Sequence, residues 1–161
     1  MSGDSGEKVR RRTAVRVLPL DGRDRLLLLH GFDPADRERP YWFTVGGGID
    51  PGESPELAAV RELAEEVGLV SEPSALVGPL GRATIEFGFD AVRYVQDQTY
   101  YALRVDDAPI SFAGQDAIEQ ASIDSHAWWT IDDLRGTTER VYPEDLPDLL
   151  TRAVVALSRP G

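Results

Sequence analysis

Three glutamates, Glu62, Glu65 and Glu66, lie within five consecutive residues that contain no basic side chain. Carboxylate oxygens are the ligands that Mg²⁺, Mn²⁺ and Ca²⁺ take in proteins. Acidic side chains also gather on exposed helix faces, where they bind only water. The composition of this group therefore leaves two interpretations open, a divalent metal site and a solvated acidic face.

These glutamates belong to the clearest helix signal in the sequence. Ser54 can cap its start, Pro55 suits the first helical position and Gly68 suits the stop. At about 100° per residue, the three carboxylates fall within about 100° of one helix face. The opposite side carries apolar residues, which we expect to be buried: Leu57, Val60, Leu63, Ala64 and Val67.

The placement of these glutamates lowers the stability of the helix. Glu62 and Glu66 are like charges at i,i+4, an arrangement that costs a few tenths of a kcal/mol. Glutamates in the last turn also oppose the helix dipole, which favours cations there. A divalent cation would reverse the sign of both effects, so the pattern favours a metal site.

A run of three glycines, Gly46 to Gly48, precedes this helix. Glycines let an ion or ligand approach the backbone closely, and their carbonyls could join a metal shell. The run is no P-loop, because no Gly-Lys-Ser/Thr follows, and it lacks the spacing of the dinucleotide fingerprint. By itself a glycine triplet is also typical of a turn.

The elements that must position these residues are mainly strands. The sequence predicts a polar loop over 31–40, short helical turns within 106–125 and 132–136, and a closing helix within 143–161. Strands are predicted by β-branched and apolar runs at 13–20, 26–30, 41–45, 74–87, 91–105 and 126–131. This mixture predicts an α+β fold with helix–sheet–helix layers.

Length and charge limit the organisation and the partners. The 161 residues suit a single domain spanning 1–161, in which residues 1 to about 10 form a polar tail. The basic cluster Lys8, Arg10, Arg11 and Arg12 is interpreted as part of a solvated tail leading into a strand. A net charge of −11 disfavours binding to a DNA or RNA duplex. With no signal-peptide pattern and no membrane-spanning run, we expect a cytoplasmic protein without a membrane partner.

The acidic helix and the glycines together match a known signature. Gly47 is followed at fixed spacing by Glu53, Arg61-Glu62-Leu63, Glu65-Glu66 and Gly68-Leu69. With every defined position filled, the chain resembles the Nudix (MutT-like) hydrolases. The resemblance implies the Nudix fold, an α/β/α sandwich with a mixed β-sheet and the Nudix helix on one face. It also implies a metal-dependent pyrophosphohydrolase, in which water cleaves the diphosphate bond of a nucleoside diphosphate linked to another moiety.

The resemblance further implies roles for individual residues, with Mg²⁺ as the cofactor and Mn²⁺ as a substitute. Glu53 would lie near the metal and hold or polarise water, and Arg61 would orient the glutamates by pairing with Glu53. The implied metal ligands are the acidic cluster and one backbone carbonyl: Glu62, Glu65, Glu66 and Gly46.

The general base is left open among several carboxylates. Glu62 is the first candidate, because a carboxylate within reach of an activated water can take its proton. In some family members the base comes from a distant loop, where Glu119 and Asp116 are the candidates here. Gln98 stands where relatives would be expected to carry a glutamate, so either the metal shell is weaker at that position or Asp97 or Glu119 supplies the ligand.

Two other functions remain to be weighed. A Nudix fold can act as a non-catalytic sensor that binds a nucleotide, although sensors usually lose residues of the signature. Isomerisation of an allylic diphosphate is disfavoured because the chain has no cysteine. We expect a nucleotide-derived small molecule as substrate, and a homodimer is left open because relatives often pair.

Overall fold

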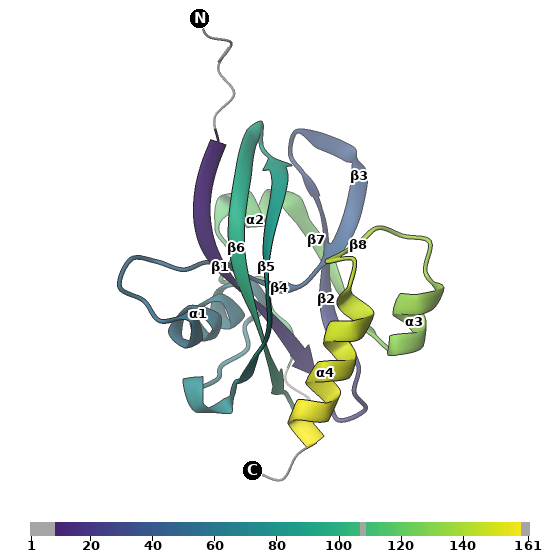
Figure 1. Cartoon of the computed structure of the whole chain (residues 1–161). Helices are drawn as coiled ribbons and strands as arrows, with labels where there is room; N and C mark the ends of the chain where they lie inside the picture. The colour runs from purple at the N-terminus through teal and green to yellow at the C-terminus, as the bar shows by residue number, and fades with distance from the viewer. Residues whose placement is uncertain (1–8, 107–108, 159–161) are drawn as a thin grey trace, which may run out of the picture.

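The computed structural model describes residues 9–106 and 109–158, which form one mixed sheet covered by helices (Figure 1). The strands are β1 (Val9–Leu20), β2 (Leu26–Asp33), β3 (Asp36–Phe43), β4 (Val45–Gly48), β5 (Val77–Phe89), β6 (Val92–Arg104), β7 (Ile123–Trp129) and β8 (Val141–Tyr142). The helices are α1 (Pro55–Val67), α2 (Ala117–Ser122), α3 (Ile131–Gly136) and α4 (Leu146–Ser158), with a 3₁₀ turn, η1, at Pro73–Ala75.

The sheet has the strand order β5-β6-β1-β2-β3-β8, and β4 and β7 pair with β1 and β2 respectively. Its long central pair, β1 and β6, is parallel over twelve residues, whereas β1 pairs antiparallel with β4. The sheet is therefore mixed, and the predicted α+β class with helix–sheet–helix layers is confirmed.

Alternation along β1 divides the core between the two faces of the sheet. Val15 and Val17 belong to the cluster that α1 covers, whereas Leu18 and Leu20 belong to the cluster that α4 covers. Successive side chains of a strand point to opposite faces, so one strand supplies both cores. The two helices thus lie on opposite sides of the sheet (Figure 1).

Helix α1 has the caps predicted from the sequence. The Ser54 hydroxyl accepts from the Leu57 amide, Pro55 begins the helix, and Gly68 ends it in the left-handed region with φ 70°. That conformation suits glycine, which has no side chain to clash.

The buried face of α1 differs from the prediction. Leu63 and Val67 are buried as expected, but Leu57 is 52% exposed and Ala64 is also exposed. Ala58, Ala59 and the two carboxylates Glu62 and Glu66 are buried instead. The helix is rotated so that these acids face β4, because the glycines there leave room for them.

The polar segment 31–40, predicted as a loop, is mostly strand. β2 extends to Asp33 and β3 begins at Asp36, so the two form a hairpin with only Pro34 and Ala35 between them. Turn formers and charges masked this hairpin because β3 is largely exposed there and carries few apolar residues. No helix in the described parts of the chain combines the length and the hydropathy required to cross a membrane.

Replacing Leu63 by alanine tests the packing of α1. Leu63 is fully buried between α1 and the sheet, so Leu63→Ala should lower the free energy of unfolding by about 2–5 kcal/mol. Leu57→Ala, six residues earlier and half-exposed, should change it by no more than about 0.5 kcal/mol. Chemical denaturation measures both, and equal losses would contradict the observed rotation of the helix.

Candidate active site

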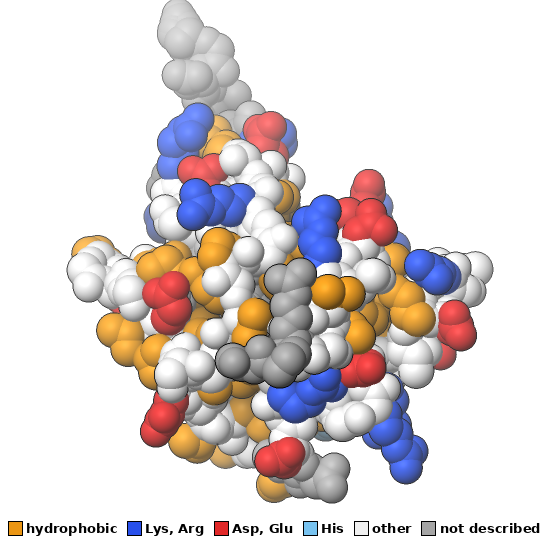
Figure 2. All heavy atoms as spheres, turned by 60° about the horizontal axis from the view of Figure 1, so that its bottom comes forward, with side chains coloured by type: hydrophobic (Ala, Val, Ile, Leu, Met, Phe, Trp, Pro, Cys, Tyr) orange, Lys and Arg blue, Asp and Glu red, His pale blue; other side chains and the backbone are white. Residues whose placement is uncertain are grey.

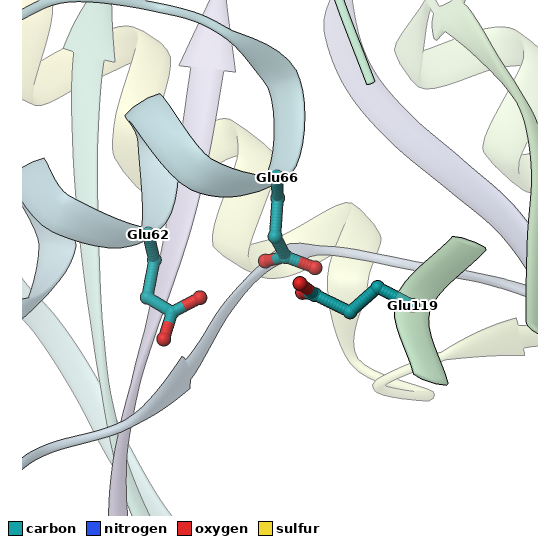
Figure 3. A group of neighbouring side chains, drawn as sticks. All are labelled: Glu62, Glu66 and Glu119. Atoms are coloured by element: carbon teal, nitrogen blue, oxygen red, sulfur yellow. The ribbon is translucent and has the colours of Figure 1, made fainter. Parts of the chain in front are cut away.

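Three carboxylates from two helices converge on one point (Figure 3). Glu62 and Glu66 project from α1, and Glu119 reaches them from α2. One oxygen from each side chain lies within 4.8 Å of the others. Glu62 and Glu66 are buried and Glu119 is half-buried, so the acidic face is not a solvated one.

The glycines of β4 permit this convergence. The amide of Gly46 donates to Glu66 Oε1 at 2.7 Å. A Cβ on Gly47 would lie 2.5 Å from Glu62 Oε1, a distance shorter than Cβ atoms show in real structures. The backbone of β4 therefore packs directly against the carboxylates because Gly47 has no side chain.

Arg61 holds the outer side of the cluster together. Its Nη2 donates to Glu53 Oε1 at 2.8 Å and its Nε donates to Glu53 Oε2 at 2.9 Å, so the expected pairing is present. The same guanidinium donates to the Gly48 carbonyl and, at 2.8 Å, to Glu62 Oε1. Such a fork fixes the carboxylate orientation through several charge-assisted bonds.

Glu119 arrives at the cluster because its segment caps the end of α1. The last carbonyls of a helix lack partners within the helix. Here the Ser111 amide donates to the Val67 carbonyl, and the buried Gln115 side chain donates to the Glu66 carbonyl at 3.1 Å. Gly114 packs so tightly on α1 that a Cβ would lie 3.0 Å from the Glu65 carbonyl oxygen.

A capping box then orients the Glu119 side chain. Its amide donates to Asp116 Oδ1 at 2.8 Å, and its Oε1 accepts from the Asp116 amide at 3.1 Å. Asp116 is thus used in holding α2 rather than in the cluster. Of the two loop candidates for the general base, the structure brings Glu119 to the other carboxylates.

The environment makes the negative charges of this cluster unfavourable. Burial raises the pKa of Glu66 well above its ordinary value, and Glu62 raises it further, against the opposing effects of Arg16 and the Gly46 amide. Burial also raises the pKa of Glu62, against Arg61, and the pKa of Glu119. Hydrogen bonds from Arg61 instead lower the pKa of Glu53 to about 2.

The remaining predicted residues lie outside the close cluster. Glu65 is exposed and lies 3.4 Å from Arg61 Nη1. Asp97 is exposed and accepts from the Thr84 hydroxyl. Gln98 is buried and bonded to Gln96 and Tyr100. Of Asp97 and Glu119, the two candidates for the ligand missing at Gln98, only Glu119 lies in the cluster.

Two contacts at this site were not predicted from the sequence. Gln115 ties the 111–116 segment to α1, and Arg16 lies beside Glu66 on the far side of Gly46. The unpaired carbonyls at the end of any helix are a general signal that some group must cover them. They do not say which of the later polar residues does so.

Comparison with known proteins places this geometry in a family. The family model described as NUDIX domain matches residues 10–149. The chain belongs to the NUDIX domain family. Over 72 residues it is 35% identical to the mouse diphosphoinositol polyphosphate phosphohydrolase 3-alpha, covering 45% of this chain and 42% of that one. Over 143 residues it is 29% identical to the RNA pyrophosphohydrolase of Novosphingobium aromaticivorans, covering 86% of this chain and 82% of that one.

Solved Nudix structures share the fold. The MutT protein from Methanosarcina mazei Go1 superposes with a TM-score of 0.65 at 18% identity, covering 94% of this chain and 97% of that one. Several curated relatives of this Nudix chain align over only about two fifths of their own length, 38% to 42%. The fold is therefore common to the family, whereas the names of these relatives do not transfer to this chain.

The raised pKa of Glu66 predicts an unusual pH dependence of stability. Because burial favours the protonated carboxyl, the folded-state pKa of Glu66 lies above the ordinary 4.5, and this group stabilises the folded protein only at low pH, where it is protonated. This stabilisation is lost as pH rises through the folded pKa. In EDTA, the parent should lose stability as the pH rises above the ordinary pKa of 4.5, and Glu66→Gln should lose less and be more stable near neutral pH. Thermal unfolding at several pH values measures this.

Glu72→Gln is the matched control, because Glu72 is exposed and follows α1 without entering the cluster. It should keep the pH dependence of the parent. A Glu66→Gln variant that is less stable than the parent near pH 8 would contradict the assignment of an electrostatic cost to this carboxylate.

Proposed function

We propose that this Nudix chain is a metal-dependent pyrophosphohydrolase. Its substrate would be a nucleoside diphosphate linked to another moiety, which water would split into a nucleoside monophosphate and a second phosphate-bearing product. The observation that carries the proposal is the convergence of Glu62, Glu66 and Glu119 within 4.8 Å. In a protein of this family, such a cluster suits the binding of a divalent cation beside a diphosphate.

The residues present fit a divalent cation on chemical grounds. Three carboxylates offer only oxygen ligands, which Mg²⁺ and Mn²⁺ prefer. Burial raises the pKa of each of them, and nearby carboxylates raise each one further, so a positive charge among them would be strongly favoured. When bound, such an ion supplies charge neutralisation of the diphosphate and a more acidic water.

The ligands we propose are Glu62 and Glu66, with Glu119 from the second helix. Glu65, on the exposed side of Arg61, and the carbonyl of Gly46 would complete the shell. Glu65, whose side chain is 47% exposed, would reach an ion from the solvent side. The number of ions held by this set is a matter for titration.

The remaining groups of the site would control protons and orientation. Arg61 and Glu53 hold Glu62 in place through the contacts described above, so both would act as positioning residues. Glu53 also keeps its charge to low pH, which suits it to hold a water molecule. Glu62 is the first candidate for the general base and Glu119 the second.

We further propose the class of substrate, the domain organisation and the location of the protein. The substrate would be a nucleotide-derived small molecule, the whole chain would be one domain in the cytoplasm, and a homodimer stays open. On the face shown in Figure 2, basic side chains are interspersed with acidic and apolar ones, so that face offers no continuous basic surface for a nucleic-acid duplex.

Glu66→Gln tests the proposed function. The substitution retains the acceptor for the Gly46 amide but removes a charged ligand, so it should lower kcat/KM by about 10²-fold to 10³-fold. It should also abolish the rise in melting temperature that Mg²⁺ or Mn²⁺ causes in the parent. A panel of nucleoside diphosphate derivatives measures the first effect, and thermal unfolding measures the second.

Glu72→Gln is again the control, and it should match the parent in both measurements. Undiminished hydrolysis by a folded Glu66→Gln variant would refute the role of this residue. A parent protein that is stabilised by nucleotides but cleaves none of them with either metal would instead support the sensor function.

Glu62→Gln and Glu119→Gln separate the two candidates for the base. Loss of the base should lower kcat and remove the acidic limb of its pH profile, while the other variant keeps that limb. We expect this result for Glu62→Gln. Glu119→Gln should mainly weaken metal binding, by about tenfold or more, as measured by metal titration. The opposite pattern would assign the base to Glu119.

A further inference from the structure

Two arginines of β1, Arg12 and Arg16, have no part in the proposed hydrolysis. Within residues 9–106 and 109–158, neither forms an ion pair with an acidic side chain, whereas Arg61 contacts four. The chain has a net charge of −11 and 28 acidic residues. What sets these two arginines apart is their position: they are close enough for Arg16 to lower the pKa of Arg12, and Arg16 also lowers the pKa of the buried Glu66.

Arg16 lies directly behind the carboxylate cluster. It pairs with Gly46 across the β1–β4 ladder, and a Cβ on Gly46 would lie 3.0 Å from its Cδ. Its Nη1 donates to the carbonyl of Thr44 at 3.1 Å. The Gly46 amide binds Glu66, so a single strand of backbone separates Arg16 from the cluster.

Arg12 lies four residues before Arg16, on the same face of β1. Its guanidinium carbon is 4.9 Å from the centre of the Tyr94 ring and 5.8 Å from that of Phe87, and these two rings are stacked on each other. Its Nε donates to Gln96 Oε1. Both terminal nitrogens are left without a protein acceptor in the described parts of the chain.

A buried polar ladder on β6 runs beside the two arginines. Gln96 Nε2 donates to Gln98 Oε1 at 2.7 Å, and Gln98 Nε2 donates to the Tyr100 hydroxyl. In the parallel register, Gln96 is opposite Arg12 and Tyr100 is opposite Arg16. These side chains therefore share one sheet face, and Gln96 and Gln98 are 0% and 4% exposed.

This arrangement is electrostatically costly without a ligand. The surrounding protein lowers the pKa of Arg12 by desolvation, and the positive charge of Arg16 lowers it further. Both side chains are nevertheless held in fixed positions, by Gln96 and the two rings for Arg12 and by Thr44 for Arg16. Fixed donors next to a site for a polyanion reduce the cost of ordering on binding.

We propose that Arg12 and Arg16 bind a negatively charged group of the substrate outside the scissile diphosphate, namely the third phosphate of a nucleoside triphosphate. The proposal rests on the proposed function, because the carboxylate cluster must hold the adjacent diphosphate. A guanidinium binds phosphate oxygens through paired N–H groups. Arg16 and Glu66 both lie against Gly46, which suits a group bonded directly to the diphosphate.

The proposal names a substrate class. Nucleoside triphosphates carry a further phosphate beyond the bond between the first two phosphorus atoms. ADP-ribose and nucleotide sugars carry an uncharged sugar at that position. The two arginines should therefore select triphosphates over diphosphates joined to a sugar.

The experiment compares the parent with Arg12→Gln and Arg16→Gln on ATP and on ADP-ribose, with Mg²⁺. The parent should have the higher kcat/KM for ATP. Each variant should lower this value for ATP by about tenfold to a hundredfold, mainly through KM, and change it for ADP-ribose by no more than about twofold. Arg16→Lys should give an intermediate loss, because it keeps the charge without the fork.

Arg11→Gln is the matched control. Arg11 lies on the same strand and is exposed, but it points to the opposite face. The variant changes the net charge by the same amount, and it should behave as the parent on both substrates. An equal loss in Arg11→Gln would show a general charge effect and overturn the proposal.

Binding of α,β-methylene ATP and α,β-methylene ADP, measured by calorimetry with Mg²⁺, isolates the third phosphate without turnover. The parent should bind the triphosphate analogue more tightly, and Arg12→Gln and Arg16→Gln should remove that difference. Equal losses on both analogues, or no loss on either, would overturn the proposal. Failure of the parent to hydrolyse any diphosphate would refute the proposed function alone, because the analogues still decide what the arginines bind.

Discussion

The burial of two like charges at the contact between α1 and β4 is the constraint on which the site depends. Glu62 and Glu66 are buried on the face of α1 that also carries Leu63 and Val67, so the helix cannot pack on the sheet without taking its carboxylates inside. Each acid accepts at least one hydrogen bond, from Arg61 or from the Gly46 amide. These bonds satisfy oxygen atoms but do not remove the repulsion, and the raised pKa values record what remains. The free energy that offsets this cost comes from the apolar cluster beneath the helix.

The glycines of β4 are the structural answer to the same constraint. Gly46 has φ 153°, a backbone conformation that residues with a side chain rarely adopt, and Gly47 packs against Glu62. Neither position has a side chain to pack, and as a result the backbone contacts the carboxylates of Glu66 and Glu62 directly. The last turn of α1 shows a similar exchange, because its carbonyls are covered by the 111–115 segment rather than by a continuing helix. A site strained in these ways is stable only where the surrounding structure fixes it.

Much of this could be predicted from the sequence, and the failures have physical causes. The limits of α1, its caps and the antiparallel pair β5–β6 follow from local patterns. The buried face of α1 was predicted only in part, because the helical period placed Glu62 and Glu66 opposite the apolar side, whereas the fold buries both carboxylates beside Leu63 and Val67. The arrival of Glu119 depends on tertiary contacts 49 residues apart, which no local signal encodes. Arg12 was interpreted as part of a solvated tail, because its partners on β6 are 84 positions away.

The strand β1 connects these separate features. Its odd residues Val15 and Val17 support the helix that carries the acids, and its even residues Arg12 and Arg16 line the other face. Its ladder with β4 fixes Gly46 between Arg16 and Glu66. A one-residue slip in this register would exchange the two faces, placing arginines under α1 and valines beside the polar ladder. Glu66 and Arg16 therefore lie on opposite sides of Gly46, because the alternation along β1 directs Arg16 away from α1. A polyanion with a metal ion can be held by both side chains.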